Sequence, residues 1–198
     1  PICSHIKKLE AENFYRWNLS LYRSDAGLHE STPWYATNYD DNNWQTVNMF
    51  SQSWGNNGLN PIGGSHWLRQ DIEIPQSWNG KEATLRLGCI VDADSVYVNG
   101  VFVGTTSYQY PPRIYRIPAG ILKSEKNNIT VRIISNGGQP GFVQEKPYKI
   151  ICDNEEINLK QKWKYRLGAP MPPAPEMMFF WYKPVCLYNA MIAPLQNY

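Results

Sequence analysis

Ser95-Val96-Tyr97-Val98-Asn99-Gly100-Val101-Phe102-Val103-Gly104 is the stretch that decides the fold class. Two arms rich in β-branched and aromatic residues flank Asn99-Gly100. This dipeptide accepts positive φ at both central positions of a type I′ turn, the turn that joins two antiparallel strands through a two-residue loop. The stretch therefore predicts a β-hairpin, with Asn99 and Gly100 in a structural role at its turn.

Strand-like runs recur at short spacing on both sides of this hairpin, with Gly, Pro and Asn turns between them. Many short strands in this arrangement are typical of a sandwich or jelly roll, and nothing in their order suggests βαβ alternation. The predicted fold class is mostly β, an antiparallel β-sandwich of the jelly-roll type with an N-terminal helix and an extended C-terminal segment. The runs are 66–74, 83–88, 114–117, 128–134, 148–152 and 156–159.

The ends of the chain differ in character from its centre. Residues 5–22 carry apolar side chains at helical spacing, which predicts an amphipathic helix. That helix docks either on its own domain or on a partner domain, and the sequence favours neither. Four prolines within 166–176 indicate a semi-rigid linker, and the apolar blocks after it are expected to belong to a second domain. The predicted division is a helical lead-in at 1–28, the sandwich at 29–162 and a linker returning to another domain at 163–198.

Composition excludes several classes of function. The net charge is +2, from 19 basic and 17 acidic residues that form no cluster, so nucleic-acid binding is not expected. No apolar run is long enough to span a bilayer. The four cysteines are far apart and contain no CxxC pair, which argues against a zinc ribbon or a thioredoxin site. Cys89 lies in an apolar run and is interpreted as a buried thiol.

No catalytic constellation is visible. The sequence has no GxSxG nucleophile elbow, and none of His5, His29 and His66 stands in a nucleophile–base pattern. Asp92-Ala93-Asp94 is expected in a turn; oxygen ligands there would suit calcium, but EF-hand spacing is absent. The prediction is therefore no catalytic residue, no metal and no cofactor within this sequence.

Aromatic residues are abundant, with 8 Trp and 13 Tyr. Their flat faces suit either a sandwich core or stacking against the C–H faces of sugar rings. Residues 108–113, a proline-stiffened loop with two Tyr and one Arg, either grip a sugar or carboxylate through the arginine fork or pack against a neighbouring domain. The candidate carbohydrate-binding residues are Trp54, His66, Trp67, Tyr108, Tyr110 and Arg113.

A series of motifs, in order along the chain, resembles the β-galactosidase-type jelly-roll domain of sialate O-acetylesterases, which is galactose-binding-like. The hairpin alone is shared with the sugar-binding domains of β-galactosidases and β-glucuronidases. The segment 187–195 resembles the point at which the esterases return to their hydrolase domain, and it favours the esterase. The remaining motifs are at 67–75, 78–81, 85–88, 92–94, 96–100, 103–106, 113–120 and 128–132.

The resemblance implies a sandwich inserted into an SGNH-type hydrolase domain, whose serine motif would precede the insert and whose Asp–His motif would follow it. Neither motif occurs here, so the resemblance implies a non-catalytic portion of an enzyme that removes O-acetyl groups from sialic acid or related sugars. Its implied partners are that hydrolase domain and sialylated or O-acetylated glycans, in the periplasm or outside the cell. Pro140 departs from the family pattern by replacing a glycine. The alternatives are an autonomous carbohydrate-binding module and an accessory domain of a β-galactosidase- or β-glucuronidase-like glycosidase.

Overall fold

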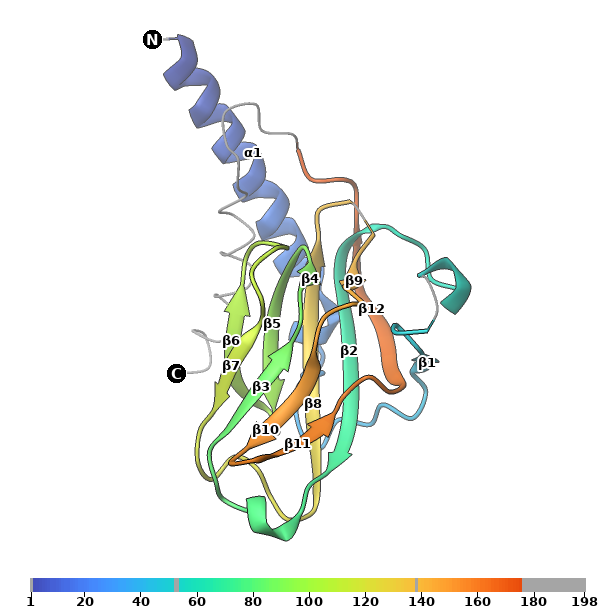
Figure 1. Cartoon of the computed structure of the whole chain (residues 1–198). Coiled ribbons are helices and arrows are strands. Elements are labelled where there is room, and N and C mark those ends of the chain that lie inside the picture. The colour runs from blue at the N-terminus through green and yellow to red at the C-terminus, as the bar shows by residue number, and fades with distance from the viewer. Residues whose placement is uncertain (1, 52–53, 138, 176–198) are drawn as a thin grey trace.

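The β-sandwich predicted from the hairpin is the observed fold. The computed structural model describes residues 2–51, 54–137 and 139–175. Two antiparallel sheets face each other, and the helix α1 (Ile2–Ser24) rises from one end of the sandwich (Figure 1). The short helix α2 (Ala26–His29) and two 3₁₀ turns (Gly55–Asn57 and Gln76–Trp78) lie in the connections.

The larger sheet has six strands in the order β1-β12-β2-β8-β5-β6, and the smaller has four in the order β11-β10-β3-β7. A third pair, β4 with β9, is separate from both. The strands of the larger sheet are β1 (Gln45–Val47), β2 (Gly63–Glu73), β5 (Ala93–Val98), β6 (Val101–Thr106), β8 (Lys126–Ser135) and β12 (Trp163–Met171). The others are β3 (Ala83–Leu87), β4 (Ile90–Val91), β7 (Ile114–Ile117), β9 (Gly141–Phe142), β10 (Tyr148–Cys152) and β11 (Glu155–Asn158).

The hairpin is confirmed in detail. Val98 of β5 pairs with Val101 of β6, so the loop consists of Asn99 and Gly100 alone. Their φ angles are 50° and 80°, the positive values that a type I′ turn requires at both positions.

The core lies between the two sheets and follows the two-residue period of the strands. Leu68, Val96 and Val131 are neighbours in the register of the larger sheet, and all three are fully buried. They belong to one apolar cluster with Leu85 and Ile150 of the smaller sheet. Inward-facing apolar side chains therefore hold the sandwich together.

The outer face of the larger sheet is covered as well, by the N-terminal segment. Phe14, Trp17 and Leu21 of α1 cluster with Ile134 of β8, and the Trp17 indole donates a 2.9 Å hydrogen bond to the Pro172 carbonyl. The sequence favoured neither its own domain nor a partner domain as the docking site of the helix. In the structure, the C-terminal half of the helix docks on its own domain. Neither described helix combines the length and apolar character of a membrane span.

Two local predictions differ from the structure. Trp163–Met171, predicted to begin the linker, form β12 between β1 and β2, so the sandwich extends past residue 162. Trp163 and Tyr165 point into the core at alternate positions, and this period outweighs the proline-rich composition that follows. Asp94, predicted in a turn, lies in β5. The predicted return to a second domain falls on residues 176–198, outside the described part.

Candidate functional site

Three of the predicted sugar-binding side chains lie in the interior. Trp67 is fully buried, and its indole donates to Asp25 at 2.9 Å. Trp54 is 5% exposed and donates to the Asn60 carbonyl at 2.8 Å. His66 is fully buried. Because their polar atoms are satisfied within the fold, these three residues serve packing instead of a surface site.

His66 also lacks the partners of a catalytic histidine. Its ring nitrogens lie 2.9 Å from the Tyr165 hydroxyl and 3.0 Å from the Ile62 carbonyl. Burial lowers its pKa to about 4, against smaller opposing effects of the Ile62 carbonyl and the Asp25 charge. His66 is therefore neutral at pH 7, and no nucleophile contacts it among the bonds that the structure shows.

Tyr108 and Tyr110 are placed differently, on the loop between β6 and β7. Their side chains are 40% and 67% exposed, whereas most large aromatic rings of the described chain are buried. The two ring centroids are 5.1 Å apart and the planes meet at 79°. The loop thus presents two aromatic faces to solvent, at nearly a right angle to each other.

Arg113 fixes this loop from below. Its side chain is fully buried, and its Nε donates to Asp94 at 2.6 Å. The other four bonds go to backbone carbonyls, two within the tyrosine loop itself (Gln109 and Pro111) and two before β5 (Ile90 and Asp92). A guanidinium has five N–H donors, so Arg113 has none left for a ligand. It positions the loop and does not itself grip a sugar or carboxylate.

Asp94 completes the support under the loop. It is fully buried, and its second oxygen accepts a 2.5 Å hydrogen bond from the Tyr115 hydroxyl. Burial raises the pKa of Asp94 to about 6, with Arg113 and Tyr115 opposing the rise. A further bond runs from the Cys89 thiol to the Tyr110 carbonyl at 3.1 Å. Cys89 is buried, as its apolar surroundings in the sequence predict.

A loop of this kind is suited to binding and not to bond-breaking. Tyr side chains supply a large contact area at low conformational cost. Because buried hydrogen bonds already fix the loop, binding does not have to order it, and this favours affinity. The thiol and carboxylate nearest to the loop in the bonds described above, those of Cys89 and Asp94, are both buried and already hydrogen-bonded.

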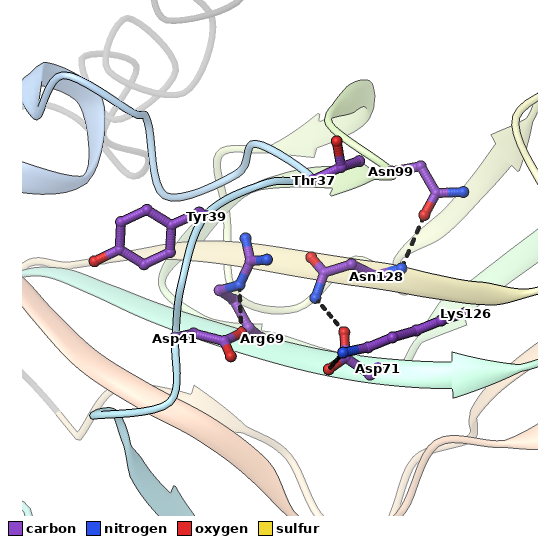
Figure 2. Close-up of a pocket in the computed structure, with 8 residues that line it drawn as sticks. All are labelled: Thr37, Tyr39, Asp41, Arg69, Asp71, Asn99, Lys126 and Asn128. Atoms are coloured by element: carbon purple, nitrogen blue, oxygen red, sulfur yellow. Dashed lines mark hydrogen bonds and ion pairs between the residues drawn. The ribbon is translucent and has the colours of Figure 1, made fainter.

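A second concave feature lies on the outer face of the larger sheet, beside the Asn99-Gly100 turn (Figure 2). This polar pocket encloses about 110 Å³. Its wall comes from the segment after α2, from β2 and β8, and from the hairpin turn. The lining residues are Thr37, Tyr39, Asp41, Arg69, Asp71, Asn99, Lys126 and Asn128.

Ion pairs organise this pocket in two halves. Arg69 donates to Asp41 at 2.8 Å, and both side chains are nearly buried. Lys126 lies 2.7 Å from Asp71, and the Asn128 amide donates to the same carboxylate at 2.9 Å. Sequence reasoning missed these residues because they lie far apart along the chain. The available signal was the charge at Arg69 and Asp71, two residues apart and so on one face of a strand.

The described residues hold no group of three or more His, Cys, Asp and Glu side chains that could bind a metal ion. Asp92, the other carboxylate of the predicted turn, accepts hydrogen bonds from the backbone and side chain of Asn136 at 2.9 and 3.1 Å. These bonds give Asp92 a structural role.

No protein-family model and no curated protein matches the chain. Three of the similar solved structures are β-glucuronidases, each with a TM-score of 0.36. The enzyme from Ruminococcus gnavus is 22% identical over 45% of this chain and 15% of its own. That from Bifidobacterium dentium is 22% identical over 41% and 13%, and that from Faecalibacterium prausnitzii 21% over 44% and 14%.

The matched part of this chain spans only 13–15% of the length of each of these glucuronidases. A likeness at this TM-score says nothing about function. The geometry of the chain itself is the evidence for function. None of these three structures supports the resemblance to sialate O-acetylesterases.

Proposed function

We propose that this chain is a non-catalytic, carbohydrate-binding β-sandwich of a carbohydrate-active hydrolase. The observation that carries the proposal is the exposed pair of Tyr108 and Tyr110 on a loop that Arg113 fixes from the interior. One ring face would stack against the C–H face of a sugar, and the second ring would contact its edge.

Calorimetric titration of the 198-residue chain with galactose, glucuronic acid, sialic acid and O-acetylated sialic acid tests this function. We expect saturable heat with at least one of these sugars. Tyr110→Ala should weaken that binding about tenfold or more, equivalent to about 1.4 kcal/mol. Tyr15→Ala is the matched control, because Tyr15 is 46% exposed but lies on α1.

Arg113→Lys separates positioning from contact. Lysine keeps a positive charge near Asp94 but cannot make the five bonds of the guanidinium, so the loop should loosen and affinity should fall while both rings remain. A folded chain that gives no heat with any of the four sugars would sink the carbohydrate-binding proposal. The tyrosine loop would then be assigned to packing against a neighbouring domain.

We propose that the hydrolase itself is a sialate O-acetylesterase. Its SGNH-type catalytic domain would belong to the same polypeptide, and the enzyme would act outside the cytoplasm. The motif series given above supports this choice. Assays of the whole protein with O-acetylated sialic acid and with 4-nitrophenyl β-D-glucuronide discriminate it from the glycosidase alternative. Release of acetate is expected. Hydrolysis of the glucuronide without acetate release would establish the glycosidase alternative instead.

A further inference from the structure

The polar pocket beside the hairpin turn lies away from the tyrosine loop. Strand β6 begins next to Asn99 and Gly100 and ends at Thr106, just before the loop that carries Tyr108 and Tyr110. Six strand residues span roughly 20 Å. A ligand in this pocket would therefore occupy a site separate from the two tyrosine rings.

The charges around the pocket select the class of ligand. Among the lining residues, Asp41 and Asp71 are balanced by Arg69 and Lys126, and Lys164, which pairs with Asp41 from outside the lining, adds one positive charge. A phosphate or carboxylate would be repelled by two carboxylates. A divalent cation prefers several oxygen ligands, and here two cationic side chains would oppose it. A neutral polar ligand meets neither penalty.

One half of the pocket is a fixed wall. The Arg69 guanidinium also donates to the Trp34 carbonyl and to the Thr130 hydroxyl. Asp41 accepts hydrogen bonds from both Arg69 and Lys164. Burial raises the pKa of Asp41, but these two hydrogen bonds outweigh it and hold the pKa below its ordinary value. This wall keeps its charges and its shape at neutral pH.

The other half keeps hydrogen-bonding capacity for a ligand. The Lys126 ammonium has three N–H donors, and the structure shows one bond, to Asp71. Each Asp71 oxygen accepts one bond in the structure, from Asn128 or Lys126, and has a second lone pair. The side chains of Lys126 and Asp71 are 70% and 29% exposed, so a ligand can reach both.

We propose that this pocket binds a neutral polyhydroxyl ligand, such as a hexose residue, with two adjacent hydroxyl groups held by Asp71 and Lys126. One hydroxyl donates to the carboxylate and the other accepts from the ammonium. The neighbouring donor and acceptor, 2.7 Å apart, match the alternation of a vicinal diol. Figure 2 shows Thr37 and Asn99 across from this pair, on the rim where further sugar hydroxyls would lie. The inference goes beyond the proposed function, because it adds a second carbohydrate site.

The test follows the side-chain amide signals of Asn99 and Asn128 by NMR while the chain is titrated with D-galactose, D-glucose, inorganic phosphate or calcium chloride. The two sugars cover both orientations of the hydroxyl at C4. We expect saturable shifts with at least one sugar, and none with phosphate or calcium. Saturation by phosphate or calcium in place of the sugars would overturn the inference, as would the absence of any shift.

Two variants locate the diol contact. Asp71→Asn replaces the anionic acceptor with a neutral amide, and Lys126→Met removes the ammonium donors while keeping a long stem. Each should raise the dissociation constant obtained from the sugar-induced shifts at least tenfold. Lys149→Met is the matched control, because Lys149 pairs with Glu156 in the smaller sheet. If both pocket variants bound like the parent chain, the assignment to Asp71 and Lys126 would be wrong.

Tyr110→Ala separates this inference from the proposed function. It should leave the pocket shifts unchanged while it removes binding at the tyrosine loop. Pocket shifts that persist when Tyr110→Ala has no effect on any titration would overturn the loop proposal alone. Heat that depends on Tyr110, without any shift at Asn99 or Asn128, would overturn the pocket alone.

Discussion

The two faces of the larger sheet are both buried, yet they are built from different chemistry. The inner face carries Leu68, Val96 and Val131 at the centre of the apolar core. On the outer face, the residues next to Leu68 in β2 are Trp67 and Arg69, and Arg132 follows Val131 in β8. The strands alternate as a sheet with one solvated face would, but the N-terminal segment covers the polar side.

The segment that covers the charged outer face supplies hydrogen-bonding partners for its buried arginines. Asp25, at the start of α2, accepts hydrogen bonds from Arg132 at 2.7 Å, Trp67 at 2.9 Å and the Gly27 amide at 3.0 Å. Asp41 does the same for Arg69 further along. Buried charges are tolerated when they are paired and hydrogen-bonded. The inner face therefore depends on volume, and the outer face depends in addition on the placement of two carboxylates.

The largest expected effect comes from removing a carboxylate from the outer face. Asp25→Ala would leave the fully buried Arg132 without its anion. Removing one partner of a buried ion pair costs roughly 3–5 kcal/mol, and we expect about 4 kcal/mol here from urea denaturation. Glu30→Ala, at an exposed site just after α2, is the control and should change little.

A double variant tests whether apolar residues can replace the buried ion pair on the outer face. Replacing a buried ion pair by apolar residues of similar size is often neutral or stabilising. Asp25→Leu with Arg132→Met should therefore recover most of the loss seen in Asp25→Ala, apart from the Trp67 and Gly27 donors left unpaired. A double variant as unstable as Asp25→Ala would show that those two hydrogen bonds, and not the charge, dominate.

On the inner face, Leu68→Ala should cost about 3 kcal/mol, within the range for buried Leu→Ala substitutions. Leu68 is fully buried between the sheets, and the loss arises from transfer energy and the remaining cavity. Because it involves no charge, this loss should be the same at pH 5 and pH 8. A loss that varied with pH would show that the Leu68 site is coupled to a titrating group. Leu9→Ala, at a 45% exposed leucine on α1, is the control.

The inner face also holds two buried titrating groups, His66 and Asp94. The pKa of His66 is about 4 in the folded chain against 6.5 ordinarily, so the unfolded chain binds more protons between these values. The free energy of unfolding therefore rises with pH across this window. Asp94 acts in the opposite direction, because its raised pKa makes stability fall as pH rises toward about 6.

Comparison with His66→Gln isolates the histidine, since Asp94 is common to both proteins. The parent chain should gain roughly 2–3 kcal/mol relative to His66→Gln between pH 4 and 6.5. Thermal or urea unfolding at several pH values measures this difference. Parallel stability curves for the two proteins would show that His66 is not responsible.

The sequence predicted the features that local chemistry determines. The hairpin, the strands 114–117 and 148–152 and the sandwich itself follow from turn residues and alternation, and the structure confirms them. Strand β12 was missed because Gly168 and Pro170 interrupt its pattern. The pairing with β2 that makes it a strand is a long-range interaction.

The candidate sites show the same division. The tyrosine loop was predicted because Tyr108, Tyr110 and Arg113 are close in sequence, although the structure turns Arg113 inward. Trp67 was a candidate because it is aromatic. Only the fold shows that Asp25, 42 residues earlier, binds its indole. The polar pocket brings together four segments, and the one local signal, the charges of Arg69 and Asp71 on one face of a strand, covers only two of its residues.

The smallest loss of stability is expected at the hairpin turn, at Gly100. Gly100 has φ +80°, and a Cβ there would only touch the Tyr35 carbonyl at 3.5 Å and Thr37 at 3.8 Å. Gly100→Ala should therefore cost about 1 kcal/mol, from backbone strain and not from a clash. Gly55→Ala is the matched control: its Cβ would meet nothing within 4 Å, and its φ lies outside the positive range. That substitution should be neutral or slightly stabilising. Equal losses in the two variants would show that the positive φ of Gly100 adds no strain of its own to the hairpin that joins β5 to β6.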